Sequence, residues 1–366
     1  MKYKKISAGS LSSAAKLALS AGAIIAALNF SLHTGGIKAV QTKSTAESGS
    51  MSEAQPLAQT GEAQESVSEE KTESVSENSF SLPEDIEKMR QEYTAAFSGK
   101  TADGKISEVF FVTKGATDCV GKVAIRNTTG EQKPDFAALL EAGAKLSIED
   151  KAQPCVLIFH THTTESYQLA DDGQFFSEYS TRSENSGRNM VRIGDEICSV
   201  LKENGIGYIH DTEIYDKSYN GAYSRSRASV LDYLKRYPSI KIVLDVHRDA
   251  IYYSDSERGK PTAIIDGKKA AQIMIISGAE GGAVTDFPSW EDNLRFALSL
   301  QKTAQDMHEG LMRPIYFCER RYNMDTASCS LLLEIGSDSN TLEEALYSAR
   351  LLGEALSAVV NQYSGG

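Results

Sequence analysis

The hydrophobic pattern changes along this chain, and it is most regular in the second half. From residue 154 onward, short apolar runs alternate with segments whose apolar residues recur every three or four positions. The runs predict strands buried on both faces, and the segments predict amphipathic helices. Strands are expected at residues 155–159, 206–210, 240–246, 273–277, 314–317 and 330–335. Helices are expected at residues 188–202, 222–237, 290–309 and 341–362.

Strands that alternate with helices favour an α/β fold for residues 151–366. We expect a three-layer domain with a mostly parallel central sheet flanked by helices. The last predicted helix opens with Thr341 and Glu344, a capping-box pair that satisfies free backbone N–H groups. The preceding segment, 84–150, is interpreted as a small N-terminal module or an extension of this domain. Its pattern predicts strands at 109–113 and 120–125 and a brief helix at 136–142.

The N-terminal pattern is that of a membrane-targeting segment. Residues 1–5 are rich in lysine, and residues 17–32 form an almost uninterrupted apolar run. This order predicts a cytoplasmic tip and a single transmembrane anchor over residues 1–33. An uncleaved anchor is favoured over a cleaved signal peptide because no convincing small-x-small cleavage site is followed by a folded domain. Residues 34–83, rich in Ser, Thr and Glu, predict a disordered acidic linker, and the order of these segments predicts that the folded part after it lies outside the cytoplasm.

Charge and cysteine content exclude some classes of function. The formal net charge is -12. A nucleic-acid binder would need clustered Lys and Arg to neutralise phosphates, so no nucleic-acid partner is expected. The chain has five cysteines, an odd number without a Cys-x-x-Cys pair. They are interpreted as small buried hydrophobic residues rather than as disulfides or metal ligands.

Residues suited to metal chemistry occur at the ends of three predicted strands. His162 and Glu165 come shortly after strand 155–159, and His247 follows strand 240–246. Catalytic zinc takes imidazole nitrogens and a carboxylate and keeps one position for water, so these three residues are the predicted zinc ligands. Glu334 lies near the end of strand 330–335 among apolar residues, which would raise its pKa toward neutrality. It is the predicted catalytic residue that moves protons.

Three of these positions have competing interpretations. His160 and His162 point to opposite sides of an extended chain, so only one of them is expected to bind the metal directly. The carboxylate ligand is either Glu165, from the same turn, or Glu184, from a distant loop. Arg248 is a candidate for holding a substrate carboxylate or stabilising the oxyanion, with a surface salt bridge as its alternative.

Several other polar residues have less specific patterns. Asp245 either orients a histidine from behind or caps a turn. Four side chains either line a groove or serve only the surface and core of a helix: Tyr215, Tyr219, Tyr223 and Arg225.

Four segments together resemble a known family. They read Val-Leu-Ile-Phe-His-Thr-His-Thr-Thr-Glu-Ser (156–166), Leu-Asp-Val-His-Arg-Asp-Ala (244–250), Arg-Tyr-Asn (321–323) and Leu-Glu-Ile-Gly-Ser-Asp-Ser-Asn-Thr-Leu-Glu-Glu-Ala (333–345). This series strongly resembles the stage II sporulation protein P family, the septal peptidoglycan hydrolases of endospore-forming bacteria. The order of anchor, spacer and α/β domain matches too.

The domain is also similar to zinc-dependent N-acetylmuramoyl-L-alanine amidases. Their pattern of a histidine after the first strand, a later histidine and a Glu-x-Gly-x-x-x-Asn motif is matched here by His162, His247, Glu334, Gly336 and Asn340. This alignment favours His162 over His160. The carboxylate ligand departs from that pattern, because those amidases place it farther along, before a helix.

The resemblance implies a function and a location. It implies hydrolysis of the lactyl–L-alanine amide, cleavage of peptide cross-links, and sporulation proteins D and M as partners during engulfment. It also implies a mother-cell membrane location at the septum. Two alternatives are a zinc carboxypeptidase, with Arg248 or Arg225 holding the terminal carboxylate, and a wall-binding scaffold without turnover.

Overall fold

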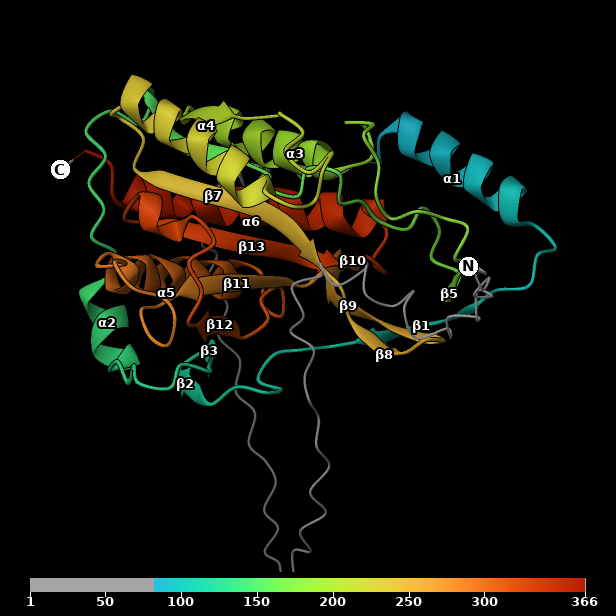
Figure 1. The fold of residues 1–366 in the computed structure, drawn as a ribbon, viewed down its shortest axis with the longest axis horizontal. Helices are drawn as coiled ribbons and strands as arrows, with labels where there is room; N and C mark the ends of the chain where they lie inside the picture. The colour runs from blue at the N-terminus through green and yellow to red at the C-terminus, as the bar shows by residue number, and fades with distance from the viewer. Residues whose placement is uncertain (1–81, 366) are drawn as a thin grey trace, which may run out of the picture. The chain divides into compact units, whose positions relative to one another are not determined.

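The computed structural model describes residues 82–365, and their core is an eight-stranded sheet (Figure 1). The anchor predicted at residues 1–33 and the linker up to residue 81 lie outside the described residues. None of the helices in residues 82–365 combines the length and the apolarity needed to cross a membrane.

The central sheet is mostly parallel, as the sequence predicts. Its order is β2-β3-β12-β11-β13-β7-β4-β6, and only the pairs β2–β3 and β11–β13 are antiparallel. The strands are β2 (Asp118–Val120), β3 (Val123–Asn127), β4 (Pro154–Phe159), β6 (Gly207–His210), β7 (Ile242–Asp249), β11 (Ile273–Gly278), β12 (Ile315–Cys318) and β13 (Ser330–Ser337). The six strands predicted from residue 155 onward are therefore confirmed to within two residues at each end, except that β7 extends three residues beyond its predicted carboxyl end.

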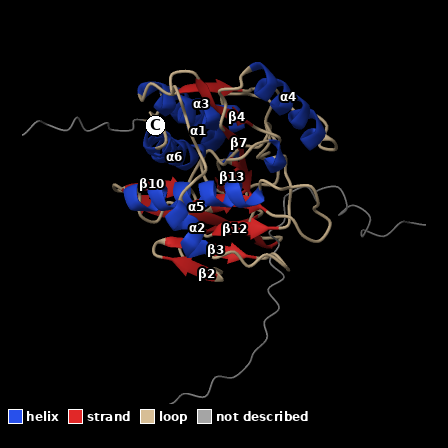
Figure 2. Ribbon diagram, turned by 90° about the vertical axis from the view of Figure 1, so that its left-hand side faces the viewer, coloured by secondary structure: helices blue, strands red, loops and turns tan. Residues whose placement is uncertain are grey.

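Helices cover the central sheet as two outer layers. On one face α3 (Met190–Glu203) and α5 (Trp290–Met307) pack beside α6 (Leu342–Gln362), and α2 (Phe136–Ala142) packs against α5. On the other face Val230 of α4 (Ala222–Arg236) lies in one cluster with Leu157 and Phe159 of β4. Figure 2 shows α4 set apart from α3, α5 and α6. The three-layer α/β arrangement follows from these contacts.

A second sheet was not predicted from the sequence. It runs β10-β9-β1-β5, with β8 paired to β9. Its strands are β1 (Gly104–Val109), β5 (Gln174–Phe175), β8 (Tyr252–Ser254), β9 (Glu257–Ile265) and β10 (Lys268–Ala271). The strand predicted at 109–113 was wrong except for its first residue, because the polar segment 104–109 pairs with β9 whereas Phe110 is 56% exposed.

Residues 84–150 contribute to both sheets. Helix α1 (Glu84–Phe97) follows Pro83 and has an acidic first turn. Strand β1 joins the second sheet, and β2–β3 extends the central sheet beside β12. All five cysteines are free, and four of them are buried as predicted. Cys119 is the exception, because it lies exposed on the edge strand β2.

Candidate active site

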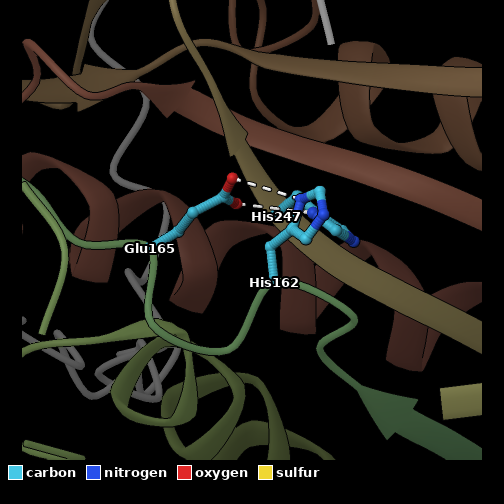
Figure 3. A group of neighbouring side chains, drawn as sticks. All are labelled: His162, Glu165 and His247. Carbon is cyan, nitrogen blue, oxygen red and sulfur yellow. Dashed lines mark ion pairs between the residues drawn. The ribbon is translucent and has the colours of Figure 1, made fainter. Parts of the chain in front are cut away.

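His162 and Glu165, in the turn after β4, meet His247 near the carboxyl end of β7 (Figure 3). His162 Nδ1 lies 3.4 Å from Glu165 Oε1, and His247 Nδ1 lies 3.4 Å from Glu165 Oε2. One donor atom from each residue falls within 4.8 Å of the others. All three side chains are at most 3% exposed. Two imidazole nitrogens and a carboxylate therefore converge on one buried point.

Threonines of the His-Thr-His-Thr-Thr-Glu segment hold the turn that carries His162 and Glu165. The Thr163 hydroxyl donates to His160 O at 2.7 Å, and the Thr164 hydroxyl donates to Asp216 Oδ2 at 2.6 Å. The backbone N–H of Glu165 donates to His162 O at 3.0 Å. These contacts bend the chain so that residues three apart face the same point.

Asp245 lies directly behind His247. Its Oδ1 is 2.7 Å from His247 Nε2 and accepts a hydrogen bond from the Thr161 backbone N–H at 2.8 Å. Its Oδ2 accepts from the Thr161 hydroxyl at 2.7 Å, and that hydroxyl also contacts Ser226 Oγ at 2.7 Å. A carboxylate in this position fixes the ring orientation and leaves Nδ1 directed at Glu165. Of the two interpretations of Asp245, the structure favours the one that orients a histidine.

Glu334 is brought beside this group by strand register. It pairs with His247 across β13 and β7, and a register shift follows between Glu334 and Ser337. Gly336, inside this irregularity, has φ +65°, and a Cβ there would lie 2.6 Å from Asn340 Oδ1. Asn340 Oδ1 accepts from the Ser337 N–H at 2.9 Å. The glycine and asparagine of the Glu-x-Gly-x-x-x-Asn motif thus shape the backbone that follows Glu334.

The Glu334 carboxyl is buried and incompletely paired. It is 2% exposed, and its Oε2 has no hydrogen-bond partner among the described residues. Burial and the neighbouring carboxyls of Asp249 and Glu165 raise the pKa of Glu334 to about 8. A divalent cation at the adjacent group would lower that pKa again, since it adds positive charge to the same site. Burial and a bound cation thus shift the pKa of Glu334 in opposite directions, which suits a carboxyl that must both take up and release a proton.

The charges of the site favour an ionised Glu165. Burial by itself would raise the pKa of Glu165, but Arg248, His162 and His247 together hold it well below its usual range. Burial would likewise lower the pKa of His247, but Asp245 and Glu165 raise it well above its usual range. In the metal-free protein, a proton on His247 takes the place of positive charge that a metal ion would bring.

Arg248 lies behind Glu165. Its Nε donates to Ser166 O at 3.2 Å and its Nη2 donates to Thr181 O at 3.0 Å. Its Nη1 is 3.9 Å from Glu165 Oε1. The buried guanidinium therefore acts on Glu165, and the predicted alternative of a surface salt bridge does not fit its position. Arg225 donates to the backbone carbonyls of Tyr215 and Ser218, so both basic candidates for a carboxypeptidase pocket are occupied by structural contacts.

The competing ligands lie elsewhere. His160 turns away from the group, with Nδ1 2.9 Å from Val246 O and Nε2 2.9 Å from His210 Nε2. Burial and the neighbouring His210 hold the pKa of His160 well below its usual range. Glu184 is exposed. The structure thus brings together the favoured pair, His162 and Glu165, rather than their alternatives.

Two tyrosines border His162: Tyr219, in the segment before α4, and Tyr223, the second residue of α4. The Tyr219 ring stacks on the imidazole at 5.0 Å, and the Tyr223 ring meets it edge-on at 5.5 Å. Burial and the charges of three carboxyls raise the pKa of Tyr223 well above its usual value; these are Asp245, Glu334 and Glu165. Tyr215 instead donates to Asp211 Oδ2 at 2.5 Å, away from this group.

Sequence reasoning missed one basic residue of the site. Arg182 comes from the loop before α3, where it bridges Glu165 Oε1 at 3.4 Å and Asp216 Oδ2 at 2.8 Å. Its guanidinium also lies 5.8 Å from the centre of the Tyr219 ring. Nothing in the local pattern around residue 182 marks it, because its contacts depend on the loop folding back over the Glu165 turn.

The donor set fits a zinc ion. Structural chemistry pairs zinc with imidazole nitrogen and carboxylate oxygen, and catalytic sites use three protein ligands. Here the carboxylate of Asp245, which is not one of the three predicted ligands, contacts Nε2 of His247. Such a contact is common for zinc-binding histidines. Glu334 stands beside the group with an oxygen that is unpaired within residues 82–365.

Comparison with protein families gives one match over most of the chain. The model of stage II sporulation protein P (SpoIIP) matches residues 27–357. A curated relative, stage II sporulation protein P of Bacillus subtilis (strain 168), is 28% identical over 214 residues, which is 55% of this chain and 50% of the relative. The match therefore spans half the length of that relative.

Solved structures with a related chain path are more distant. An N-acetylmuramoyl-L-alanine amidase of Nostoc punctiforme has a TM-score of 0.36 at 10% identity, covering 59% of this chain and 98% of its own. An N-acetylmuramoyl-L-alanine amidase from Clostridium difficile 630 has a TM-score of 0.32 at 16% identity, covering 58% and 97%. A metallo-carboxypeptidase from Burkholderia cenocepacia has a TM-score of 0.30 at 9% identity, covering 65% and 71%. Likenesses this distant leave the activity to be argued from the site itself.

Proposed function

Because the chain belongs to the stage II sporulation protein P family, we propose that it is a zinc-dependent peptidoglycan hydrolase that cleaves the N-acetylmuramoyl–L-alanine amide. The observation that carries this proposal is the convergence of two imidazoles and a carboxylate beside a buried, incompletely paired Glu334. Amide hydrolysis needs a polarised carbonyl, an activated water and a group that moves protons between them. The candidate active site contains residues suited to each task.

In this proposal His162, Glu165 and His247 hold the zinc ion. The ion would supply Lewis acidity to a water molecule and to the substrate carbonyl. Glu334 accepts the proton of the attacking water on a carboxylate oxygen and then delivers it to the nitrogen of the leaving amine. Its burial and its neighbours tune it for this exchange, because a carboxyl that ionises near neutral pH can work in both directions.

Arg248 and Asp245 serve as positioning residues. Arg248 keeps Glu165 ionised and directed at the metal position, since its guanidinium is held by two backbone carbonyls and faces Glu165 Oε1. Asp245 orients His247 from the opposite side. In our proposal Arg248 acts through Glu165, and it does not stabilise the oxyanion as we expected from the sequence.

The experiment that tests the function is a digestion of purified peptidoglycan by the full chain, with products identified by mass spectrometry. Metal-dependent release of free stem peptides is the expected result, and a chelator should stop it. The Glu334→Gln variant should retain zinc and lose activity, because the amide keeps the shape of the side chain but cannot accept the proton. An E334Q variant with zinc bound and wild-type turnover would refute the assignment of Glu334.

Other products would point to other functions. Stem peptides that stay on the glycan while cross-links disappear would indicate endopeptidase action, which we propose as a second activity. Release of single terminal residues would indicate the carboxypeptidase alternative. Absence of any product, also with partner proteins added, would favour the wall-binding scaffold.

The family membership supports three further proposals. Residues 1–33 anchor the chain in the septal and engulfing membrane of the mother cell, with the catalytic domain outside the cytoplasm. Sporulation proteins D and M are its partners in septal wall thinning and engulfment. Protease accessibility in intact and permeabilised sporulating cells tests the orientation, and co-purification from sporulating cells tests the partners.

A further inference from the structure

The Tyr223 side chain borders the candidate active site, and its buried hydroxyl has no hydrogen-bond partner among the described residues. Tyr223 is the second residue of α4, and its ring meets His162 edge-on at 5.5 Å and stacks on Tyr322 at 5.3 Å. The hydroxyl oxygen is buried, and within residues 82–365 no atom pairs with it. A buried hydroxyl left unpaired costs stability, so its retention requires another explanation.

Ring contacts place the Tyr223 side chain beside the candidate active site. Its ring meets His162, whose Nδ1 lies 3.4 Å from Glu165 Oε1 and whose ring lies 5.0 Å from that of His247. The Tyr223 ring is fixed between His162 and Tyr322, so the hydroxyl cannot swing out to solvent without breaking both contacts. The side chain is therefore held rigidly beside His162, and its hydroxyl is a donor that no described residue accepts from.

The loop before β13 holds Tyr223 in this position. Asn323 Nδ2 donates to Tyr223 O at 3.0 Å and to Ser226 Oγ at 3.1 Å. Tyr322 and Asn323 both have left-handed backbone angles, with φ +40° and +60°. Asparagine adopts this region readily, but it is unfavourable for a tyrosine. The Tyr322 conformation therefore persists because the surrounding structure imposes it.

This loop contains the Arg-Tyr-Asn segment that the metal chemistry leaves unexplained. Its tyrosine supplies the stacking partner of Tyr223, and its asparagine supplies the backbone clamp. Tyr322 therefore holds the ring of Tyr223, and Asn323 holds its backbone, so that both residues fix this side chain beside His162.

We propose that Tyr223 donates a hydrogen bond from its hydroxyl to the carbonyl oxygen of the amide that is cleaved. The inference rests on the proposed hydrolase function and adds a catalytic residue to it. Negative charge accumulates on that oxygen as water attacks, and a donor fixed in advance stabilises it more strongly in the transition state than in the ground state. No proton is transferred, so Tyr223 stays a neutral phenol throughout.

The test compares Tyr223→Phe with Tyr93→Phe in the full chain. Tyr93 is a matched control, because its hydroxyl is also buried without a partner among the described residues, but its ring packs against Phe97, Phe176 and Tyr179. Both variants should keep the zinc content and the thermal midpoint of the wild type, since each loses only an unpaired oxygen. Peptidoglycan turnover should fall on the order of 10²-fold in kcat for Y223F alone, with KM little changed.

The outcomes distinguish a failure of the role proposed for Tyr223 from a failure of the proposed hydrolase function. An active wild type and a Y223F variant with kcat within about threefold of it would overturn the role of Tyr223 and leave the hydrolase function standing. Loss of zinc or of thermal stability in Y223F would also overturn it, because the hydroxyl would then serve the fold or the metal. An inactive wild type would refute the proposed function and this inference together.

Discussion

The carboxylate behind His247 leads to a quantitative prediction about metal affinity. Replacing Asp245 by Asn or Ala removes its charge or its whole side chain from Nε2 of His247, 2.7 Å away. The two variants differ in the hydrogen-bond acceptors that they leave for His247 and Thr161. Asn keeps one oxygen that can face His247 and the Thr161 N–H, whereas Ala leaves His247, the Thr161 N–H and the Thr161 hydroxyl without that acceptor.

The expected magnitude follows from these contacts. Loss of a carboxylate that supports a metal-binding histidine typically weakens metal affinity about 10- to 100-fold. Asp245→Asn should lie near the lower end, about 1.4 kcal/mol in binding free energy, because the remaining oxygen can still accept from the Thr161 N–H and face His247 although the charge is lost. Asp245→Ala should lie near the upper end, about 2.8 kcal/mol, because the ring also loses its orientation.

The assay is competition for zinc between the metal-free full chain and a chromophoric chelator at constant pH. Asp325→Asn is the control: Asp325 is paired with both Nη atoms of Arg227 at 2.7 and 2.8 Å and touches none of the predicted ligands. Its zinc affinity should match that of the wild type. The reasoning is refuted if D245A binds zinc as tightly as the wild type, or if D325N weakens binding as much as D245N.

Two further predictions concern stability. Folding raises the pKa of His247 above its unfolded value of 6.5, and it raises the pKa of Glu334 from 4.5 to about 8. Each group therefore stabilises the fold fully below its unfolded pKa, and this stabilisation is lost as pH rises through its folded-state pKa. Urea unfolding of the metal-free chain should therefore show stability falling from about pH 6.5 to about pH 8, less steeply in E334Q, and rising stability in this window would contradict the reasoning. Below about pH 6.5 the depressed pKa of buried His160 acts in the opposite direction. Lys260→Met should cost about 3–5 kcal/mol in the free energy of unfolding, because buried Glu344 loses its partner at 2.8 Å. The half-exposed Lys269→Met control should cost less than about 1 kcal/mol, and equal losses would argue against the burial effect.

Much of the fold could be predicted from local pattern. The apolar runs that became β4, β7 and β13 are buried on both faces, so hydrophobicity alone marks them. The Thr341–Glu344 capping box formed as expected, because its contacts span only one helical turn. The second sheet was missed because β9 contains charged residues such as Lys260, whose burial depends on acidic partners from distant segments.

The candidate site was predicted only in part, for a related reason. Strand ends marked His162, Glu165, His247 and Glu334, since the carboxyl ends of neighbouring parallel strands lie at one edge of a sheet. Pattern alone did not decide between His160 and His162, because the turn after β4 is bent by hydrogen bonds from Thr163 and Thr164 to distant residues.

The sequence pattern was enough to derive the order of the central-sheet strands and helices from residue 154 onward, the strand ends that carry imidazole and carboxylate groups, and the family. Which of those groups meet depends on tertiary contacts. Strand register set Glu334 beside His247. Contacts between segments 100 residues apart set Asn323 against the Tyr223 backbone. Periodicity reports which face of an element is buried, but the position of a side chain in a site depends on contacts that no local pattern encodes.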